Sequence, residues 1–271
     1  MMTVGYTIFN KVNLISRIIW SVNQCFSKED EAIFLFDNCT DGSYERFKEL
    51  ETQIEPNFRV ITPKEELFEI KANNVILKEA KGKVIVLFQD DMICTDQLIK
   101  RNINRIIKDF KSNGWKLGLM GGRSGFELEA NPVFTAFNRV SSWEHLPSQY
   151  GEPIMDGGYA VRTILNRGPL VFTRELLDEV GYLDEEYFPL HQDDADYCCR
   201  AKFKYGRKNV AFKCEIISNL KWGSTRKTKL YPIADGRVIS HGRVTKRNWR
   251  LFINRWSKDL KENHENLSRH V

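Results

Sequence analysis

Short apolar runs alternate with helix-type patterns along the first 120 residues, and this alternation restricts the fold more than any other feature. Strands are predicted over Val4–Phe9, Ala32–Phe36, Phe58–Ile61, Lys83–Phe88 and Lys116–Met120. Helices are predicted between them, over Asn13–Val22, Ser43–Gln53, Leu67–Ala80 and Thr95–Ser112. This order is typical of an α/β fold, so we expect a Rossmann-like, mostly parallel sheet with helices on both faces.

The rest of the chain gives a mixed pattern. Residues 121–148 are irregular and rich in Gly, Ser, Asn and aromatic side chains. Strands are then predicted over Leu170–Thr173 and Asn209–Ile217, and helices over Arg174–Val180 and Asp193–Lys204. With 42% apolar residues the chain can bury a large core, and no change in composition marks a linker. We predict one domain over residues 1–244, with halves 1–120 and 121–244.

The C-terminal region, residues 245–271, is predicted to be an amphipathic basic helix packed on that domain. Over Thr245–Lys261 an apolar stripe recurs at helical spacing, made of Trp249, Phe252, Ile253, Trp256 and Leu260. From Lys221 onward the chain has 13 Lys and Arg but only 4 Asp and Glu, whereas its total net charge is +5. An acidic body with a basic tail indicates contact with a membrane surface, a phosphate-bearing ligand or nucleic acid. A solvated helical face explains the charge equally well.

Base stacking on Trp249 and Trp256 would suit nucleic acid, but their spacing of seven residues is explained more simply by core packing, so no nucleic-acid partner is expected. The six cysteines include no C-x-x-C pair, and no apolar run approaches the length of a membrane span. The start of the chain has no signal-peptide pattern. We expect reduced thiols and a cytoplasmic protein, with the basic tail allowing peripheral contact with a membrane.

Acidic clusters follow two of the predicted strands. Asp37 and Asp41 follow Ala32–Phe36, and Asp90 and Asp91 follow Lys83–Phe88. Ligands of open parallel sheets bind at the carboxyl ends of the strands, and carboxylates there can hold Mg²⁺ or Mn²⁺ together with phosphate oxygens. For Asp37 and Asp41, turn formation or helix capping is the competing interpretation.

A third acidic cluster opens the predicted helix Asp193–Lys204. Three aspartates occupy four positions there, which is more than helix capping requires. Asp196 can pair with Arg200 four residues later. Asp193 and Asp194 are then candidates for a general base.

Together these segments resemble the inverting glycosyltransferases of family 2, which have the GT-A fold. The resemblance rests on the opening strand through Asn10, the segment from Phe34 to Gly42, the Asn74…Ala80-x-Gly82 pattern, and Gln89-Asp-Asp91 at the D-x-D position. The most specific part runs from Gly168 to Phe188 and on through Asp193-Asp-Ala-Asp196 to Arg200 and Gly206.

The resemblance implies transfer of a hexose or pentose from a nucleotide-diphosphate sugar to a hydroxyl of a glycan or other acceptor. The half 1–120 would bind the donor and the half 121–244 the acceptor. The residues implied to bind the donor nucleotide are Thr7, Phe9, Asn10, Asp37, Asn74 and Asp90. Asp91, with His241 or His191, would bind Mn²⁺ or Mg²⁺. Asp194 would be the base, Asp193 would orient the acceptor, and Gly168 and Arg200 would bind it.

The chain departs from the family pattern at three positions. Gln89 replaces the first acid of the D-x-D, and Asp193 replaces a Glu. The His that often precedes the turn at residues 223–225 is missing, which is why His241 and His191 are considered instead. Two other classes are kept open: a nucleotide-sugar-binding or nucleotidylyltransferase-like protein, and a module that binds nucleic acid or a membrane surface through its basic tail. A glycine-rich loop after the first strand would favour a nucleotidylyltransferase, and Phe9-Asn10-Lys11 is not one.

Overall fold

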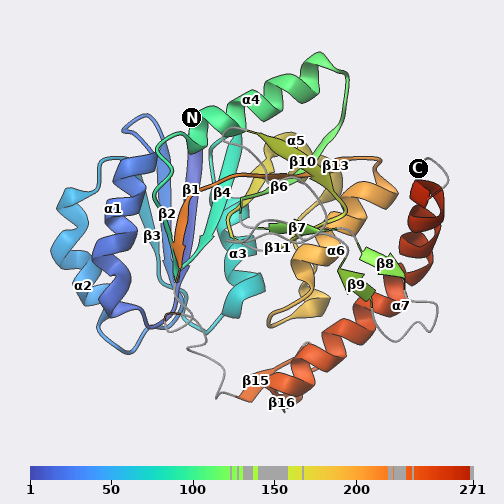
Figure 1. Cartoon of the computed structure of the whole chain (residues 1–271). Helices are drawn as coiled ribbons and strands as arrows, with labels where there is room; N and C mark the ends of the chain where they lie inside the picture. Colours follow the sequence, from blue (N-terminus) through green and yellow to red (C-terminus); the bar gives the residue numbers. More distant parts are fainter. Residues whose placement is uncertain are drawn as a thin grey trace.

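An eight-stranded mixed sheet forms the centre of the computed structural model (Figure 1). The structure describes residues 1–122, 124–126, 128–130, 137–139, 158–166, 168–218, 222, 230–233 and 235–268. The strands of the sheet, in spatial order, are β10 (Tyr159–Arg162), β13 (Lys208–Phe212), β6 (Leu117–Gly121), β12 (Leu170–Thr173), β4 (Val84–Gln89), β1 (Met2–Ile8), β2 (Glu31–Phe36) and β3 (Asn57–Ile61). The predicted sheet is therefore confirmed, with two antiparallel strands added: β12 inside the sheet and β10 at one edge.

Strand pairing explains the mixed character of the sheet. Strands β4, β1, β2 and β3 pair in parallel, as the alternating pattern predicted. Strand β12 runs antiparallel to both β4 and β6, and β10 runs antiparallel to β13. Nothing in the local pattern of β12 distinguishes an antiparallel strand from a parallel one, so this direction was not predicted.

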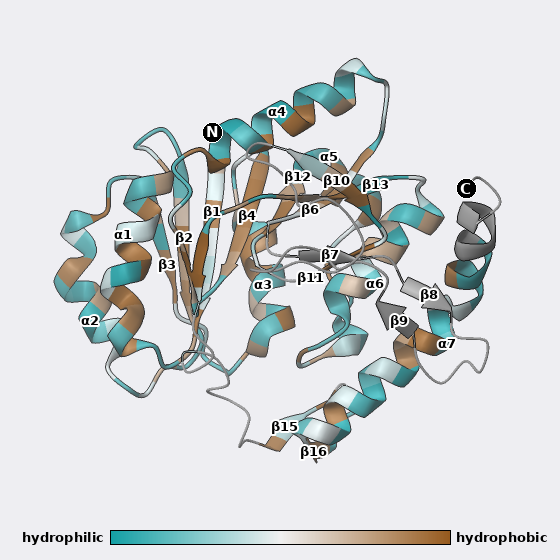
Figure 2. Ribbon diagram, viewed as in Figure 1, coloured by the Kyte–Doolittle hydropathy of each residue, from teal (hydrophilic) through white to brown (hydrophobic). Residues whose placement is uncertain are grey.

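Helices cover both faces of the sheet. Their bounds are α1 (Ile15–Cys25), α2 (Ser43–Leu50), α3 (Phe68–Glu79), α4 (Ile99–Ser112), α5 (Arg174–Val180), α6 (Asp193–Cys199) and α7 (His241–Ser268). Helices α1, α2 and α4 pack on one face, and α3, α5, α6 and α7 on the other. Successive side chains of a strand point to opposite faces of the sheet. In β2, Phe34 and Phe36 pack against the helices of the first face, and Ile33 and Leu35 pack against those of the second. Figure 2 shows brown, apolar strands between helices whose outer surfaces are largely teal.

Smaller strand pairs flank the sheet. They are β5 (Met92–Cys94) with β14 (Ile216–Ser218), β7 (Ser124–Phe126) with β11 (Ile164–Asn166), β8 (Leu128–Ala130) with β9 (Phe137–Arg139), and β15 (Leu230–Pro232) with β16 (Val238–Ser240). The predicted strand Asn209–Ile217 is wrong as a single element. It divides into β13, which pairs with β6, and β14, which leaves the main sheet to pair with β5.

The C-terminal helix begins at His241, four residues before the predicted start. Phe252, Trp256 and Leu260 are buried in the core shared with α3, α5 and α6, and Trp249 is partly buried against it. The predicted stripe therefore packs on the body of the protein, and Trp256 is not exposed for base stacking. All six cysteines are free thiols. Among the described residues, no helix has the length and apolar character that a bilayer span requires.

Candidate functional site

The loop after β1 is held by Asp90, which follows β4. A carboxylate oxygen of Asp90 accepts a hydrogen bond of 2.9 Å from the Phe9 amide, and the Lys11 ammonium lies 3.7 Å from the other oxygen. Asn10 has a left-handed backbone, with φ of 52°, and its side-chain oxygen accepts a 2.8 Å hydrogen bond from the Thr40 amide. These contacts join the carboxyl ends of β1, β2 and β4. The predicted donor-binding residues Phe9, Asn10 and Asp90 therefore lie together.

Asp37 fixes the start of α3. Its side chain is fully buried, and its two carboxylate oxygens accept hydrogen bonds of 2.6 and 2.8 Å from the amides of Leu67 and Phe68. The structure thus favours the capping interpretation of this residue. Direct contact of Asp37 with a donor base stays a prediction.

Asp41 ties two turns together. Its carboxylate accepts hydrogen bonds of 3.0 Å from the amides of Val12 and Ser43 and one from the Ser43 hydroxyl. Burial raises the pKa of this carboxyl, but the hydrogen bonds from Ser43 and Val12 outweigh burial and hold the pKa below its usual 3.8. Asp41 is therefore ionised at neutral pH and acts as a turn-forming group.

Helix α3 also contacts the carboxyl ends of β1 and β4. The Thr7 hydroxyl donates a 2.9 Å hydrogen bond to Asn73, and the Gln89 amide nitrogen donates one of 2.6 Å to Glu69. Glu69 and Asn73 are four residues apart and therefore share a helix face. That spacing is the sequence signal that could have identified them, and neither was predicted.

Asn74, the predicted donor-binding residue of α3, instead bridges to the loop before α6. Its side chain is 2% exposed, and its amide nitrogen donates to the Leu183 carbonyl at 2.9 Å and to Glu185 at 3.0 Å. Its oxygen accepts from the Leu183 amide at 3.0 Å. Both amide hydrogens are thus used within the protein. Asn74 positions this loop, and its direct contact with a donor would require these bonds to break.

Gly168 brings the second half of the chain against the turn that contains Asp91. Its φ is +91°, and a Cβ atom at this position would lie 2.0 Å from the Met92 sulfur. Only glycine fits such a backbone and such a contact. The half-buried Asp91 is adjacent to Met92, at the turn between β4 and β5. Both halves of the chain therefore meet beside the predicted metal ligand.

The predicted base lies at the start of α6. Asp193 is fully buried, whereas Asp194 is half-buried and its carboxylate accepts a 2.8 Å hydrogen bond from the Ala195 amide. Helix α6 packs on β11, which ends two residues before Gly168 in the sequence. Of the two aspartates, Asp194 has the greater access to a substrate.

Asp196 joins α6 to α7, and its predicted pair with Arg200 is present at 2.9 Å. The other carboxylate oxygen accepts from the Tyr187 hydroxyl at 3.2 Å, Arg255 at 2.9 Å and Trp256 at 2.8 Å. Arg200 also donates to the backbone carbonyls of residues 180 and 182. Each side-chain nitrogen of Arg200 therefore has a partner within the protein, so the structure supports a positioning role and acceptor binding stays a prediction.

The two candidate histidine ligands contact each other. The Nε2 atoms of His191 and His241 are 3.0 Å apart, and the His241 ring also contacts Tyr231 at 6.0 Å between centroids. Within the part of the chain that the structure describes, no group of three or more His, Cys, Asp or Glu side chains is arranged to hold a metal. Binding of a divalent cation by Asp91, with His191 or His241, stays a prediction. The turn at residues 223–225 lies outside the described residues, as do most residues between 121 and 168.

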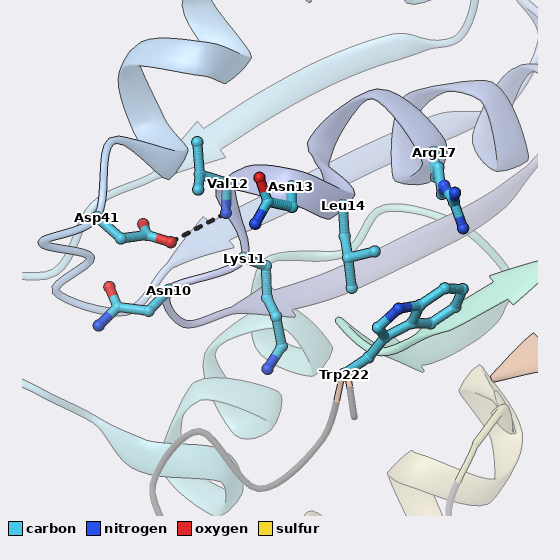
Figure 3. A pocket seen from close by; sticks show the side chains of 8 residues that line it. All are labelled: Asn10, Lys11, Val12, Asn13, Leu14, Arg17, Asp41 and Trp222. Carbon is cyan, nitrogen blue, oxygen red and sulfur yellow. Dashed lines mark hydrogen bonds between the residues drawn. The ribbon is translucent and has the colours of Figure 1, made fainter. Parts of the chain in front are cut away.

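A pocket of about 360 Å³ opens beside the loop after β1 (Figure 3). Its lining consists of Asn10, Lys11, Val12, Asn13, Leu14, Arg17, Asp41 and Trp222. The Arg17 guanidinium lies 5.2 Å from the centre of the Trp222 ring. The pocket therefore borders the loop that Asp90 holds, and Trp222 adds a side chain from the second half of the chain to its lining.

Comparison with known proteins tests the resemblance described above. Residues 3–114 match the family model for glycosyl transferase family 2. The match runs from β1 to α4, includes the acidic segments after β2 and β4, and confirms the resemblance there. The comparison with curated protein sequences gives no match.

Solved structures show that the chain has the GT-A fold. GalNAc-T7 with UDP, GalNAc and Mn²⁺ superposes with a TM-score of 0.70 at 13% identity, over 96% of this chain and 50% of that chain. S. aureus TarS 1–349 with UDP-GlcNAc gives 0.56 at 14%, over 84% and 61%. Mannosyltransferase PcManGT from Pyrobaculum calidifontis, with GDP-Man and Mn²⁺, gives 0.53 at 16%, over 79% and 55%. The chain spans about half to three fifths of the length of these solved chains.

Proposed function

We propose that this protein is an inverting glycosyltransferase that moves a hexose or pentose from a nucleotide-diphosphate sugar to a hydroxyl group of a glycan or other acceptor. The contact of Gly168 with Met92 carries the proposal, because it brings the second half of the chain to the turn that contains Asp91. Support also comes from the family match over residues 3–114 and from the nucleotide sugars bound by proteins of the same fold.

The donor would lie along the carboxyl ends of β1, β2 and β4, against the loop that Asp90 holds. Asp91 offers a hard carboxylate oxygen, and Mg²⁺ and Mn²⁺ commonly combine one or two carboxylates with the phosphate oxygens of a substrate. The residues present therefore fit a divalent cation. Such a cation would neutralise the diphosphate as it leaves.

Asp194 would accept the proton of the acceptor hydroxyl, and Asp193 would orient that hydroxyl. The oxygen of the acceptor then attacks the anomeric carbon from the face opposite the diphosphate, so a single displacement inverts the configuration. An α-linked donor would give a β-linked product. The half-exposed position of Asp194 at the start of α6 supports this assignment over Asp193, which is fully buried.

Asp194→Asn tests the mechanism, because it preserves shape and removes basicity. Turnover should fall by roughly 10²–10⁴-fold, while nucleotide binding and melting temperature stay unchanged. Asp178→Asn, at an exposed position of α5, is the matched control and should be fully active. Activity retained in Asp194→Asn but lost in Asp193→Asn would exchange the two roles. Activity in both, or an α-linked product, would refute single displacement.

Asp91→Ala tests the cation. It should abolish transfer and remove the Mn²⁺-dependent part of nucleotide binding, because Asp90 is already engaged with Phe9 and Lys11. Equal nucleotide affinity with and without Mn²⁺ in the unmodified protein would contradict the metal assignment. The loop after β1 has no glycine and is held by Asp90, so no observation favours a nucleotidylyltransferase.

We also propose peripheral contact between α7 and an anionic membrane surface. The exposed face of α7 carries a basic stripe at helical spacing, made of Arg243, Lys246, Arg250, Lys258 and Lys261. Sedimentation with vesicles containing a quarter phosphatidylserine should be strong at low salt and weak at high salt. Lys246→Glu with Arg250→Glu should remove it. Equal binding to neutral vesicles would refute the electrostatic basis.

A further inference from the structure

Gln89 stands where the family resemblance expects the first acid of the D-x-D, and a carboxylate from another element binds it. The Gln89 amide nitrogen donates a 2.6 Å hydrogen bond to Oε1 of Glu69, in the first turn of α3. Both side chains are half-buried. Position 89 thus has no carboxylate of its own, but its amide is hydrogen-bonded to the carboxylate of Glu69.

The sheet and helix positions explain this contact. Gln89 is the register partner of Thr7 across β4 and β1, so both side chains point to the face that α3 covers. Thr7 bonds to Asn73 of α3, and Gln89 bonds to Glu69 one turn earlier. Asp37 holds the amides of residues 67 and 68, which fixes the start of α3 and therefore the position of Glu69. The pair is built into the fold.

The hydrogen bond decides the orientation of the Gln89 amide. An ionised carboxylate only accepts hydrogen bonds, so the NH₂ group of Gln89 must face Glu69. The amide oxygen then points away from α3. It lies 3.5 Å from the place that a Cβ atom on Gly168 would occupy, in the region where the two halves of the chain meet. Gln89 therefore presents an acceptor oxygen to the candidate site, as an acidic residue would.

We propose that Glu69 is a positioning residue, which orients the Gln89 amide so that its oxygen accepts a hydrogen bond from a hydroxyl group of the donor. Without Glu69 the amide can turn and present its NH₂ group, which cannot accept. The inference rests on the proposed function, because it requires a nucleotide donor at this edge. It extends the site to α3 and assigns a task to the Gln at the D-x-D position.

Glu69→Gln is the first test, with UDP and GDP as the probes in calorimetry. The amide introduced at position 69 can pair with Gln89 in either orientation, so the Gln89 oxygen is no longer directed to the donor. Loss of its neutral hydrogen bond to a donor hydroxyl corresponds to roughly a 2- to 10-fold loss of nucleotide affinity. The donor KM should rise by a similar factor with little change in kcat, opposite to Asp194→Asn. Glu65→Gln removes the same charge from an exposed position before α3 and should change neither quantity.

Exchanging Glu69 and Gln89 shows whether Glu69 acts by orienting the residue at position 89 or only by stabilising the fold. Gln89→Glu alone places two carboxylates next to each other and should weaken binding. Glu69→Gln with Gln89→Glu restores one amide and one carboxylate with the partners exchanged, and should recover most of the lost affinity. Melting temperatures of all variants show whether each one folds.

Two results would overturn the inference: Glu69→Gln binding as tightly as Glu65→Gln, or the exchanged pair binding no better than Glu69→Gln alone. Each requires that the unmodified protein binds UDP or GDP, so each leaves the proposed function standing. If the unmodified protein binds no nucleotide, the proposed function fails and this inference fails with it.

Discussion

Replacement of Asp196 by Asn should destabilise the protein severely without touching the chemistry. The Asp196 side chain is fully buried and accepts four hydrogen bonds, from Tyr187, Arg200, Arg255 and Trp256. Burial, together with the Asp196 charge, raises the pKa of Tyr187 well above 10.0, so its hydroxyl stays protonated and donates. Asp196 is thus surrounded by donors only.

The cost follows from the geometry. Three donors converge on one carboxylate oxygen of Asp196, so an Asn would keep its oxygen there and turn its NH₂ group toward the Nε–H of Arg200. One charge-assisted hydrogen bond is then lost, and two guanidinium groups lose their shared counter-charge. Breaking a buried ion pair by removing one partner costs about 3–5 kcal/mol. Total stabilities are about 5–15 kcal/mol, so the change is a large fraction of the whole.

Urea unfolding followed by tryptophan fluorescence is the appropriate assay. Asp178→Asn provides the same chemical change at an exposed site, and Asp194→Asn provides it two residues earlier on the same helix. Both controls should unfold near the midpoint of the unmodified protein. A loss below about 1 kcal/mol in Asp196→Asn, the range of exposed ion pairs, would refute the view that Asp196 joins α6 to α7.

Two further predictions concern stability. Burial raises the pKa of Asp30, but Lys100 and the amides of Met2 and Ser27 outweigh burial and hold the pKa below its usual 3.8. This stabilisation is complete above pH 3.8 and is lost as pH falls through the lowered pKa, so Asp30→Asn should flatten the acid limb of a urea-midpoint profile, and an unchanged limb would contradict the assignment. Deletion of all residues after Val244 removes Phe252, Trp256 and Leu260 from the core and should abolish cooperative unfolding in calorimetry, since each large apolar side chain contributes about 2–5 kcal/mol. If the shortened chain melts at the same temperature and only loses vesicle binding, the helix serves as a membrane contact alone.

The short strand β5 was not predicted. The strands and helices that were predicted in the first half lie within a few residues of their observed bounds. Burial in the core produces patterns that are visible in short stretches of sequence. Buried apolar residues recur every three to four positions in α1, and β2 and β4 are apolar nearly throughout. The prediction of a single strand over Asn209–Ile217 was wrong because no local pattern marks the point at which it divides. β13 and β14 are both apolar, and only their partners, β6 and β5, show that the chain changes sheets between them.

For the candidate site, too, the sequence predicted local features and missed contacts between distant residues. Acidic residues at strand ends could be recognised from the sequence, and so could the pair of Asp196 with Arg200 four residues later. Their other contacts could not, because they join distant residues. Asp37 binds amides 30 and 31 positions away, Asn74 binds Leu183 across 109, and Asp196 binds Trp256 across 60. In the structure, Asp37, Asn74 and Asp196 therefore hold neighbouring segments of the chain in place through contacts that the sequence did not predict.

The support that α7 gives to α6 affects how a growing chain acquires its site. The amide nitrogen of Asn248 lies 2.5, 2.7 and 3.3 Å from the carbonyl oxygens of Tyr187, Leu190 and His191, just before the helix that carries Asp194. A ribosome makes residues 1–120 before α7, and chains fold from the N-terminus during synthesis. Strands β1, β2, β3 and β4 can therefore pair before Asn248 has been made. A newly made chain passes through a stage in which part of the sheet exists and the segment before α6 still lacks the hydrogen bonds that hold it.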